Sequence, residues 1–349
     1  MAKPKILRIG IIGAGMYACT VHMPALRKFK AVRVVAVCRH HKERLNQFCK
    51  LFHISKGYTN YKQLLDKEHL DGVVISSPHS LHYEHAKACL ERGIPVLIEK
   101  PMTIKVAHAK ELVQLAKKKQ IPIVVGYNRH YWANYCVAKK MIEDKEIGEI
   151  RFISARWVAD IEWALARTDP PGYFRTKAFH KEGDAPNFRG DPKLAGGGMF
   201  IDGGSHLLDT ILWTTGLRPR RVTAFMDNRG FQTDCDTALT MTFDSGAMAS
   251  CAVMGATKTF KGHELHIHGT KGTIFVDDYT ILYQLEGQKE VQIVDLPGDS
   301  SSTANFVNVL LRKEHVYSTA EDGLKAVIMV DAVYRAAQTG QAVEIRQWM

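Results

Sequence analysis

The stretch ILRIGIIGAGMYA, residues 6–18, decides the fold of this chain. Residues 6–12 form a largely apolar run that is typical of a buried strand, and a helical pattern follows the stretch. Between them, Gly13 permits a tight turn, Gly15 lets the backbone approach a ligand closely, and the small Ala18 allows the helix to pack against the strand. This strand–turn–helix context predicts a dinucleotide-binding fingerprint; the alternative interpretation is a plain tight turn.

Two positions near this turn predict how a dinucleotide would bind. A diphosphate binds well at a helix N-terminus, so we expect it beside Met16 and Tyr17. The second strand, residues 32–38, is followed by Arg39, where a strand that selects NAD usually ends in an acidic residue. Because a guanidinium binds a 2′-phosphate in bidentate fashion, Arg39 predicts NADP as the preferred cofactor, with NAD as the alternative. A solvated arginine at the start of the next helix is the competing interpretation.

The same alternation continues along the first third of the chain. Apolar runs at residues 71–75, 95–98 and 121–125 are separated by helical segments. Five strands that alternate with helices predict a parallel sheet with right-handed crossovers. We therefore expect an α/β protein whose residues 1–126 form a doubly wound Rossmann domain.

The run at residues 95–98 leads directly into Glu99, Lys100 and Pro101. Ligands of open α/β sheets bind just outside the carboxyl ends of such strands. Pro101 restricts Lys100 to an extended backbone, so the lysine is held stiffly at that edge. The alternative is that these residues only end a strand and begin the next helix.

Residues 127–349 are expected to form a second domain, because the pattern changes after residue 126. Consecutive strands without intervening helices predict an α+β domain with an open, mostly antiparallel sheet. Residues 159–195 are expected to be an irregular insertion of a functional kind, and residues 320–339 a closing helix. The expected strands lie at residues 150–158, 221–225, 237–243, 247–254, 263–268 and 273–277.

The second distinctive stretch is GGGMFIDGGSHLLD, residues 196–209. Asp202 and His206 are four residues apart, so on a helix they lie one turn apart on the same face. A histidine titrates near neutrality and is suited to exchange a proton, and a neighbouring carboxylate orients it or binds a hydroxyl. The alternative is an aspartate N-cap followed by a histidine that is satisfied in the core.

Composition narrows the classes of function. The chain has 349 residues, a net charge of +11 and seven cysteines without a Cys-x-x-Cys pair. The basic residues are dispersed, so we expect no nucleic-acid partner but a field that favours anionic ligands. No apolar run is long enough to span a membrane and no signal peptide is visible, so a reducing cytoplasm is expected. His263, His266 and His268 lack companion ligands and are expected on the sheet surface, so no metal is assigned.

Taken together, three motifs resemble the glucose-fructose oxidoreductase / inositol dehydrogenase / rhizopine catabolism (Gfo/Idh/MocA) family. These are the Gly13–Ala18 fingerprint, the Glu99-Lys100-Pro101 stretch and the glycine-rich stretch at residues 196–209. The resemblance covers nearly the whole chain and says little about the substrate. It implies a homodimer or homotetramer formed through the open C-terminal sheet.

The resemblance also implies roles for individual residues. Lys100 matches the lysine that bonds the reacting oxygen, and Asp202 and His206 match the family's aspartate and its proton-transfer histidine. Residues 76–82 resemble a loop that lines the cofactor, although His79 replaces a frequent asparagine. The expected cofactor contacts are therefore Gly13, Gly15, Met16, Tyr17, Arg39, Ser76, Pro78, His82, Glu99 and Lys100.

These observations predict hydride transfer between a nicotinamide cofactor and a secondary alcohol or ketone of a sugar, polyol or sugar derivative. Two other functions stay open: a glycosidase that oxidises its substrate transiently, and a non-enzymatic dinucleotide sensor. Aromatic side chains are expected in the pocket wall, and two arginines are candidates for binding an anionic group of the substrate. The candidates are Tyr131, Trp132, Trp157, Trp163 and Tyr173 for the wall, and Arg129 and Arg175 for the anionic group.

Overall fold

The computed structural model describes residues 6–168, 187–258 and 262–345, which form two compact units. The first unit contains residues up to Gly126 together with Ser301–Leu324, and the second begins at Tyr127 and holds the other described residues. The sequence suggested two continuous domains that meet at residues 126 and 127. Residues 301–324 depart from that division, because their apolar side chains pack into the core of the first unit.

Sheet A of the first unit is parallel, as predicted, with the strand order β3-β2-β1-β4-β5-β6. The five strands expected from the sequence are present, and the additional strand β3 has only two residues, too few to give a recognisable pattern. The strands are β1 (Leu7–Ile12), β2 (Val32–Cys38), β3 (Gly57–Tyr58), β4 (Gly72–Ile75), β5 (Val96–Ile98) and β6 (Ile123–Val125).

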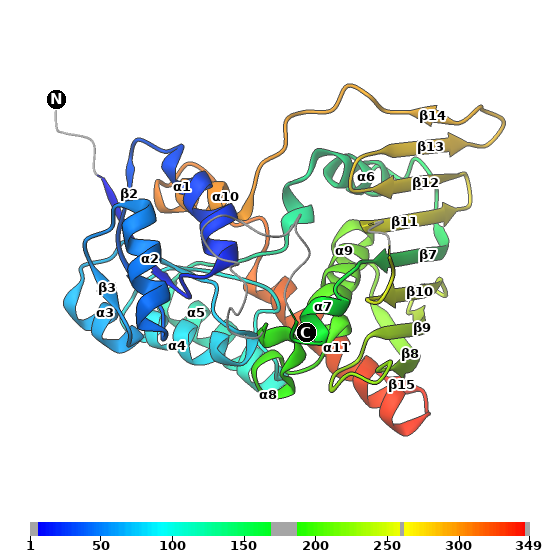
Figure 1. The fold of residues 1–349 in the computed structure, drawn as a ribbon. Coiled ribbons are helices and arrows are strands. Elements are labelled where there is room, and N and C mark those ends of the chain that lie inside the picture. The colour runs from blue at the N-terminus through cyan, green and yellow to red at the C-terminus, as the bar shows by residue number, and fades with distance from the viewer. Residues whose placement is uncertain (1–5, 169–186, 259–261, 346–349) are drawn as a thin grey trace. The chain divides into compact units, whose positions relative to one another are not determined.

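Helices connect the strands of sheet A and lie against it (Figure 1). Two of them begin without a side-chain cap: the N-cap residue is Leu81 in α4 and Lys105 in α5. The helical segments are η1 (Ala18–His22), α1 (Met23–Arg27), α2 (Lys42–Phe52), α3 (Tyr61–Lys67), η2 (His79–Leu81), α4 (His82–Glu91), α5 (Val106–Lys119) and α10 (Ser302–Leu310).

The core of the first unit explains why α10 belongs to it. Phe306 is fully buried in the same apolar cluster as Ile9 and Leu97 of the central strands. A Cβ atom built on Gly72 of β4 would lie 2.7 Å from the Phe306 ring, so a glycine is required where this ring packs on the sheet. Burial of a phenylalanine stabilises a fold by roughly 1.5–3 kcal/mol, so this ring contributes to holding α10 on the sheet.

Sheet B of the second unit is mixed, with the order β14-β13-β12-β11-β7-β10-β9-β8-β15. Its pairs are antiparallel except β7 with β10, which confirms the mostly antiparallel sheet expected from the sequence. The strands are β7 (Ile150–Val158), β8 (Pro219–Asp227), β9 (Asp236–Phe243), β10 (Met248–Met254), β11 (Gly262–Gly269), β12 (Gly272–Asp277), β13 (Ile281–Leu285), β14 (Val291–Gln292) and β15 (Val343–Glu344).

Helices lie on one face of sheet B, and in the described part of the chain the opposite face carries none (Figure 1). That open face exposes large apolar side chains, including Phe152, Phe225 and Met248. The helical segments are η3 (Asn128–Tyr131), α6 (Ala133–Glu143), α7 (Glu162–Leu165), η5 (Phe188–Gly190), α8 (Pro192–Ala195), η6 (Phe200–Gly204), α9 (Ser205–Thr215) and α11 (Ala320–Thr339), which begins in the first unit.

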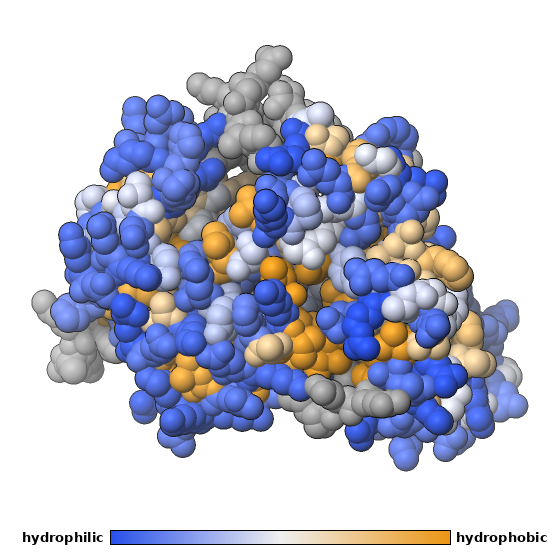
Figure 2. Space-filling view, turned by 90° about the horizontal axis from the view of Figure 1, so that it is seen from below, coloured by the Kyte–Doolittle hydropathy of each residue, from blue (hydrophilic) through white to orange (hydrophobic). Residues whose placement is uncertain are grey.

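Hydrophilic side chains cover much of the face shown in Figure 2, with smaller apolar areas between them. Among the described residues, no helix is long and apolar enough to cross a membrane.

Candidate active site

The glycine turn after β1 is held by the ends of two neighbouring strands. The N–H of Gly13 donates to the carbonyl oxygen of Cys38 at 2.9 Å, and the Ser76 hydroxyl donates to the carbonyl oxygen of Gly13 at 2.9 Å. Gly13 has a φ of +94°, and a Cβ atom there would collide with the backbone of Ser76 and Ser77. The turn therefore requires glycine at this position.

Space for a ligand is left above Gly15. A Cβ atom built on Gly15 would meet only the Gly13 carbonyl at 3.8 Å and the guanidinium of Arg39 at 3.9 Å. Arg39 reaches over the turn, and its Nη1 donates to the carbonyl oxygen of Ala14 at 2.7 Å. The helix begins directly afterwards, at Met16 and Tyr17. An open glycine at a helix start, with a cation beside it, fits the diphosphate and ribose of a nicotinamide dinucleotide.

The turn after β4 contributes buried residues that hold the backbone of the site in place. Both ring nitrogens of the fully buried His82 lie 2.8 Å from backbone carbonyl oxygens, one of Pro101 and the other of Ser77. His82 therefore ties this turn to the residue after Lys100, and this placement argues against the direct cofactor contact expected for its ring. Pro78 precedes η2, and its carbonyl oxygen accepts from the N–H of Leu81 at 3.0 Å.

Glu99 and Lys100 follow β5, as the sequence indicated, but their side chains lie in different surroundings. Glu99 is buried, with Oε1 3.3 Å from Nε2 of His22, whose Nδ1 contacts the Thr303 hydroxyl at 2.9 Å. The carboxylate of Glu99 is thus directed toward buried residues of the first unit. Lys100 is half-buried at the carboxyl end of the strand.

In the second unit, His206 is enclosed by aromatic rings. The π-helical turn η6 contains Asp202 and leads into α9, so the regular α-helical turn expected between Asp202 and His206 is widened. The imidazole stacks on Trp157, with centroids 5.0 Å apart and planes at 18°, and Tyr127 meets it edge-on at 5.7 Å. His206 is only 9% exposed, so these rings restrict the directions in which it faces.

The carboxylate of Asp202 has a partner that sequence reasoning missed. Nε of Arg189 donates to Oδ2 of Asp202 at 2.7 Å, and both side chains are mostly shielded from solvent. Asn187 fixes the start of this short segment by accepting the Arg189 N–H at 3.0 Å. The segment is irregular in sequence, and no periodic pattern marks Arg189.

Asp234 holds the glycine-rich stretch in place and was also missed. Its two carboxylate oxygens accept the N–H groups of Gly198 and Phe200, each at 2.7 Å, and the Tyr334 hydroxyl donates to Oδ1 at 2.6 Å. Burial, reinforced by Asp234, raises the pKa of Tyr334, which keeps this hydroxyl protonated as a donor. A Cβ atom on Gly198 would overlap the backbone of Asp234, so this glycine serves a close approach.

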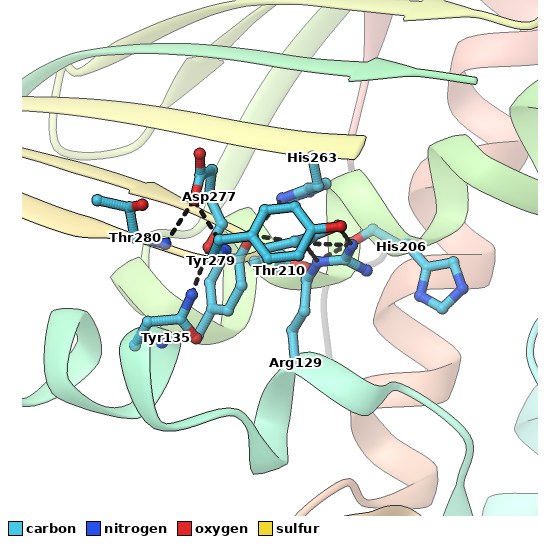
Figure 3. Close-up of polar contacts among 10 residues, drawn as sticks. Arg129, Tyr135, His206, Thr210, His263, Asp277, Tyr279 and Thr280 are labelled. Atoms are coloured by element: carbon cyan, nitrogen blue, oxygen red, sulfur yellow. Dashed lines mark hydrogen bonds and ion pairs between the residues drawn. The ribbon is translucent and has the colours of Figure 1, made fainter. Parts of the chain in front are cut away.

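Arg129, predicted to bind an anionic part of the substrate, instead has a partner inside the unit (Figure 3). Nη2 donates to both carboxylate oxygens of Asp278, at 2.7 and 2.9 Å, and the arginine side chain is 4% exposed. The guanidinium also lies over three rings, those of Trp132, Tyr135 and Trp157, at 4.7–5.7 Å. It is therefore a neutralised, buried group rather than an open anion site.

His263 corrects the expectation that all three sheet histidines lie on the surface. It is fully buried on the inner face of β11, whereas His266 and His268 lie on the other face. Nδ1 of His263 is 3.0 Å from the Tyr135 hydroxyl, which donates to Asp278 at 3.1 Å. Burial, and then the charge of Arg129, lower the pKa of His263 well below its usual value, so it is neutral.

The remaining candidates for the pocket wall and for the anionic group are Trp163, Tyr131, Tyr173 and Arg175. Trp163 is partly buried on α7, where its carbonyl oxygen accepts the N–H of Thr168 at 2.9 Å. Tyr131 is buried on η3. Tyr173 and Arg175 lie outside the described residues. Among the described residues, no group of His, Cys, Asp and Glu side chains is arranged to hold a metal ion.

Comparison with known proteins gives two family matches, one to the N-terminal and one to the C-terminal part of the chain. Residues 7–127 match the "Oxidoreductase family, NAD-binding Rossmann fold", and residues 135–275 match the "GFO/IDH/MocA C-terminal domain". Together they span most of the chain.

Individual relatives include named reductases and dehydrogenases. A dTDP-3,4-didehydro-2,6-dideoxy-α-D-glucose 3-reductase of Streptomyces antibioticus is 27% identical over 345 residues, covering 96% of this chain and 97% of the relative. An NADP-linked scyllo-inositol 2-dehydrogenase of Bacillus subtilis is 23% identical over 288 residues, covering 82% and 72%. A levoglucosan dehydrogenase, solved with NADH and levoglucosan, shares the fold with a TM-score of 0.82 at 20% identity, covering 98% and 100%.

The sequence motifs, the two sheets and both family matches agree. The chain belongs to the Gfo/Idh/MocA oxidoreductase family and is an NAD(P)-dependent dehydrogenase or reductase that acts on CH–OH groups.

Proposed function

We propose that this enzyme prefers NADP and transfers hydride between that cofactor and a secondary alcohol or ketone of a sugar, polyol or sugar derivative. The observation that carries the proposal is the position of Arg39, whose guanidinium bonds to Ala14 beside the open Gly15. A cation there attracts a 2′-phosphate, whereas the carboxylate of an NAD-selective strand end would repel it. The NADP-linked inositol dehydrogenase and the sugar-nucleotide reductase among the relatives support the cofactor and the substrate class.

In this proposal three side chains carry the chemistry. The nicotinamide supplies or accepts the hydride. Lys100 donates a hydrogen bond to the reacting oxygen and stabilises its developing negative charge. His206 takes the hydroxyl proton in oxidation and returns it in reduction, and Asp202 positions His206 and a neighbouring hydroxyl of the substrate. The aromatic rings around His206 support this role, because they hold the imidazole while shielding it from bulk water.

We also propose the assembly and the compartment. The uncovered face of sheet B, with Phe152, Phe225 and Met248 exposed, is suited to pairing with a second copy in a homodimer or homotetramer. All seven cysteines are free thiols, which favours the reducing cytoplasm.

The first experiment is a paired titration of the purified protein with NADPH and NADH, followed by nicotinamide fluorescence. Tighter binding of NADPH, followed by turnover in a screen of inositols, aldoses and keto sugars, is the expected result. Tighter binding of NADH would refute the cofactor preference. Cofactor retained through purification, with a sugar leaving group released and no net change in nicotinamide, would support the glycosidase instead. Absence of binding to either cofactor would support neither enzyme.

A further inference from the structure

The indole of Trp157 contacts two groups that differ in charge and function. The imidazole of His206 stacks on it at 5.0 Å between centroids. The guanidinium carbon of Arg129 lies 4.7 Å from the centroid of the same indole. Arg129 and the proposed proton-transfer group therefore contact the same indole. In a partly buried region, a full charge that shares a neighbour with an imidazole in this way changes the proton affinity of that imidazole measurably.

That charge is balanced in the folded protein. Arg129 bonds to Asp278 through Nε at 3.1 Å and through Nη2 at 2.7 and 2.9 Å. A guanidinium does not lose its proton in a protein, so Asp278 is the group that cancels its field. The Tyr135 hydroxyl supports the same carboxylate at 3.1 Å. In Figure 3, the guanidinium of Arg129 lies between Tyr135 and His206.

Other charged groups on the elements that pack around His206 have partners of their own. His263 is neutral and contributes no charge. The ion pairs are Arg189 with Asp202, Lys139 with Glu143, and, on the outer face of β7, Arg156 with Glu264. Asp209 of α9 lies 3.0 Å from Nε2 of His130. Arg129 with Asp278 is the pair that contacts the indole on which His206 stacks.

We propose that the Arg129–Asp278 ion pair sets the proton affinity of His206 through Trp157. Arg129, Asp278 and Trp157 are thus positioning residues: they act on His206 and not on the substrate. The carboxylate of Asp278 offsets the positive charge of the guanidinium, which would otherwise disfavour the imidazolium form of His206. Trp157 keeps the imidazole at a fixed distance from the ion pair. The inference rests on the proposed function, in which His206 exchanges the substrate proton.

The test is the pKa of His206, measured by NMR titration of its ring and assigned with His206→Asn. Asp278→Asn leaves the guanidinium unbalanced and should lower the pKa of His206 by about 0.5–1 pH unit. Arg129→Met combined with Asp278→Asn removes both charges and should restore the pKa. Arg129→Lys keeps a cation beside Asp278 and serves as the matched control, with a pKa close to that of the wild type.

The design separates an electrostatic effect from damage to packing. Packing damage alone would give no reason for the double variant to recover, since that variant loses more contacts than Asp278→Asn. If Asp278→Asn does not fold, Arg129→Gln provides the second test. It leaves the carboxylate of Asp278 without its cation, which should raise the pKa of His206. An unchanged pKa in the single variants, or a double variant that fails to recover, would overturn the inference.

Activity distinguishes failure of this inference from failure of the proposed function. For a substrate found in the screen, the acidic limb of the oxidation profile should move to lower pH in Asp278→Asn, in step with the NMR value. If His206→Asn is inactive while no variant shifts the pKa, the inference alone fails. If His206→Asn retains normal turnover, the proposed function fails whatever the NMR titration shows.

Discussion

Replacing Arg39 by aspartate should reverse the cofactor preference. Arg39 is already oriented in the structure: its backbone N–H donates to the carbonyl oxygen of Tyr58 at 3.0 Å, and Nη1 of its guanidinium donates to the carbonyl oxygen of Ala14 at 2.7 Å. A charge-assisted hydrogen bond to such a group contributes roughly 1.5–3 kcal/mol. Its loss, with a carboxylate now facing the 2′-phosphate, should cost about 2–4 kcal/mol, or roughly 30- to 1,000-fold in the Kd of NADPH.

NADH should respond differently to the same substitution. Its ribose carries a 2′-hydroxyl, which donates to the new carboxylate, and one such bond stabilises binding by about 0.5–1.5 kcal/mol. The Kd of NADH should therefore stay unchanged or fall by up to roughly tenfold. Fluorescence titrations of both cofactors at one ionic strength give the ratio of the two Kd values directly.

Arg33→Asp is the matched control for this experiment. Arg33 is exposed near the start of the same strand, β2, about 20 Å from Arg39 along the strand. Both variants change the net charge by the same amount, so an effect of the overall field appears equally in both. A ratio that is unchanged in Arg39→Asp, or changed equally in Arg33→Asp, would refute the local role of Arg39.

Three further variants test other parts of the structure. Lys100→Ala should lower kcat by at least about 100-fold while the Kd of NADPH stays close to the wild-type value; normal turnover would remove the lysine from the mechanism. Phe306→Ala should destabilise the first unit by about 3–5 kcal/mol in urea unfolding, because the ring is fully buried, and a loss below about 1 kcal/mol would contradict its place in that core. Met248→Lys places a charge on the open face of sheet B and should reduce the mass measured by light scattering; an unchanged mass would locate the assembly elsewhere.

Local patterns in the sequence were enough to predict much of the first unit. β1 and β2 follow from apolar runs, and the turn at Gly13 follows from the backbone that it requires. The packing of Phe306 could not be predicted from local patterns. Its helix is amphipathic, but nothing local indicates that it packs on strands more than 200 residues earlier, such as the one that contains Gly72.

In the candidate site too, some features follow from local sequence and others depend on the tertiary structure. Asp202 and His206 lie within a recognisable stretch, but the side-chain pairings elsewhere in the second unit have no such signal. Asp278 is 149 residues from Arg129 and Tyr334 is 100 residues from Asp234, so each pairing depends on tertiary structure alone. A local signal was available for His263. Strand period places it on the face opposite to His266, and the inner face of an open sheet is the buried one.

The Arg129–Asp278 ion pair is buried, and burying charges has a cost in free energy. Removing a charge from water costs several kcal/mol, and replacing a buried ion pair by apolar groups is often neutral or stabilising. Stability therefore gives little reason to bury Arg129 against Asp278. The position of this pair gives a better reason, because Arg129 contacts the indole on which His206 stacks. A buried ion pair fixes direction as well as position, because its energy falls steeply when its hydrogen bonds bend. The second unit thus accepts the cost of a buried ion pair next to the histidine on which we expect proton transfer to depend.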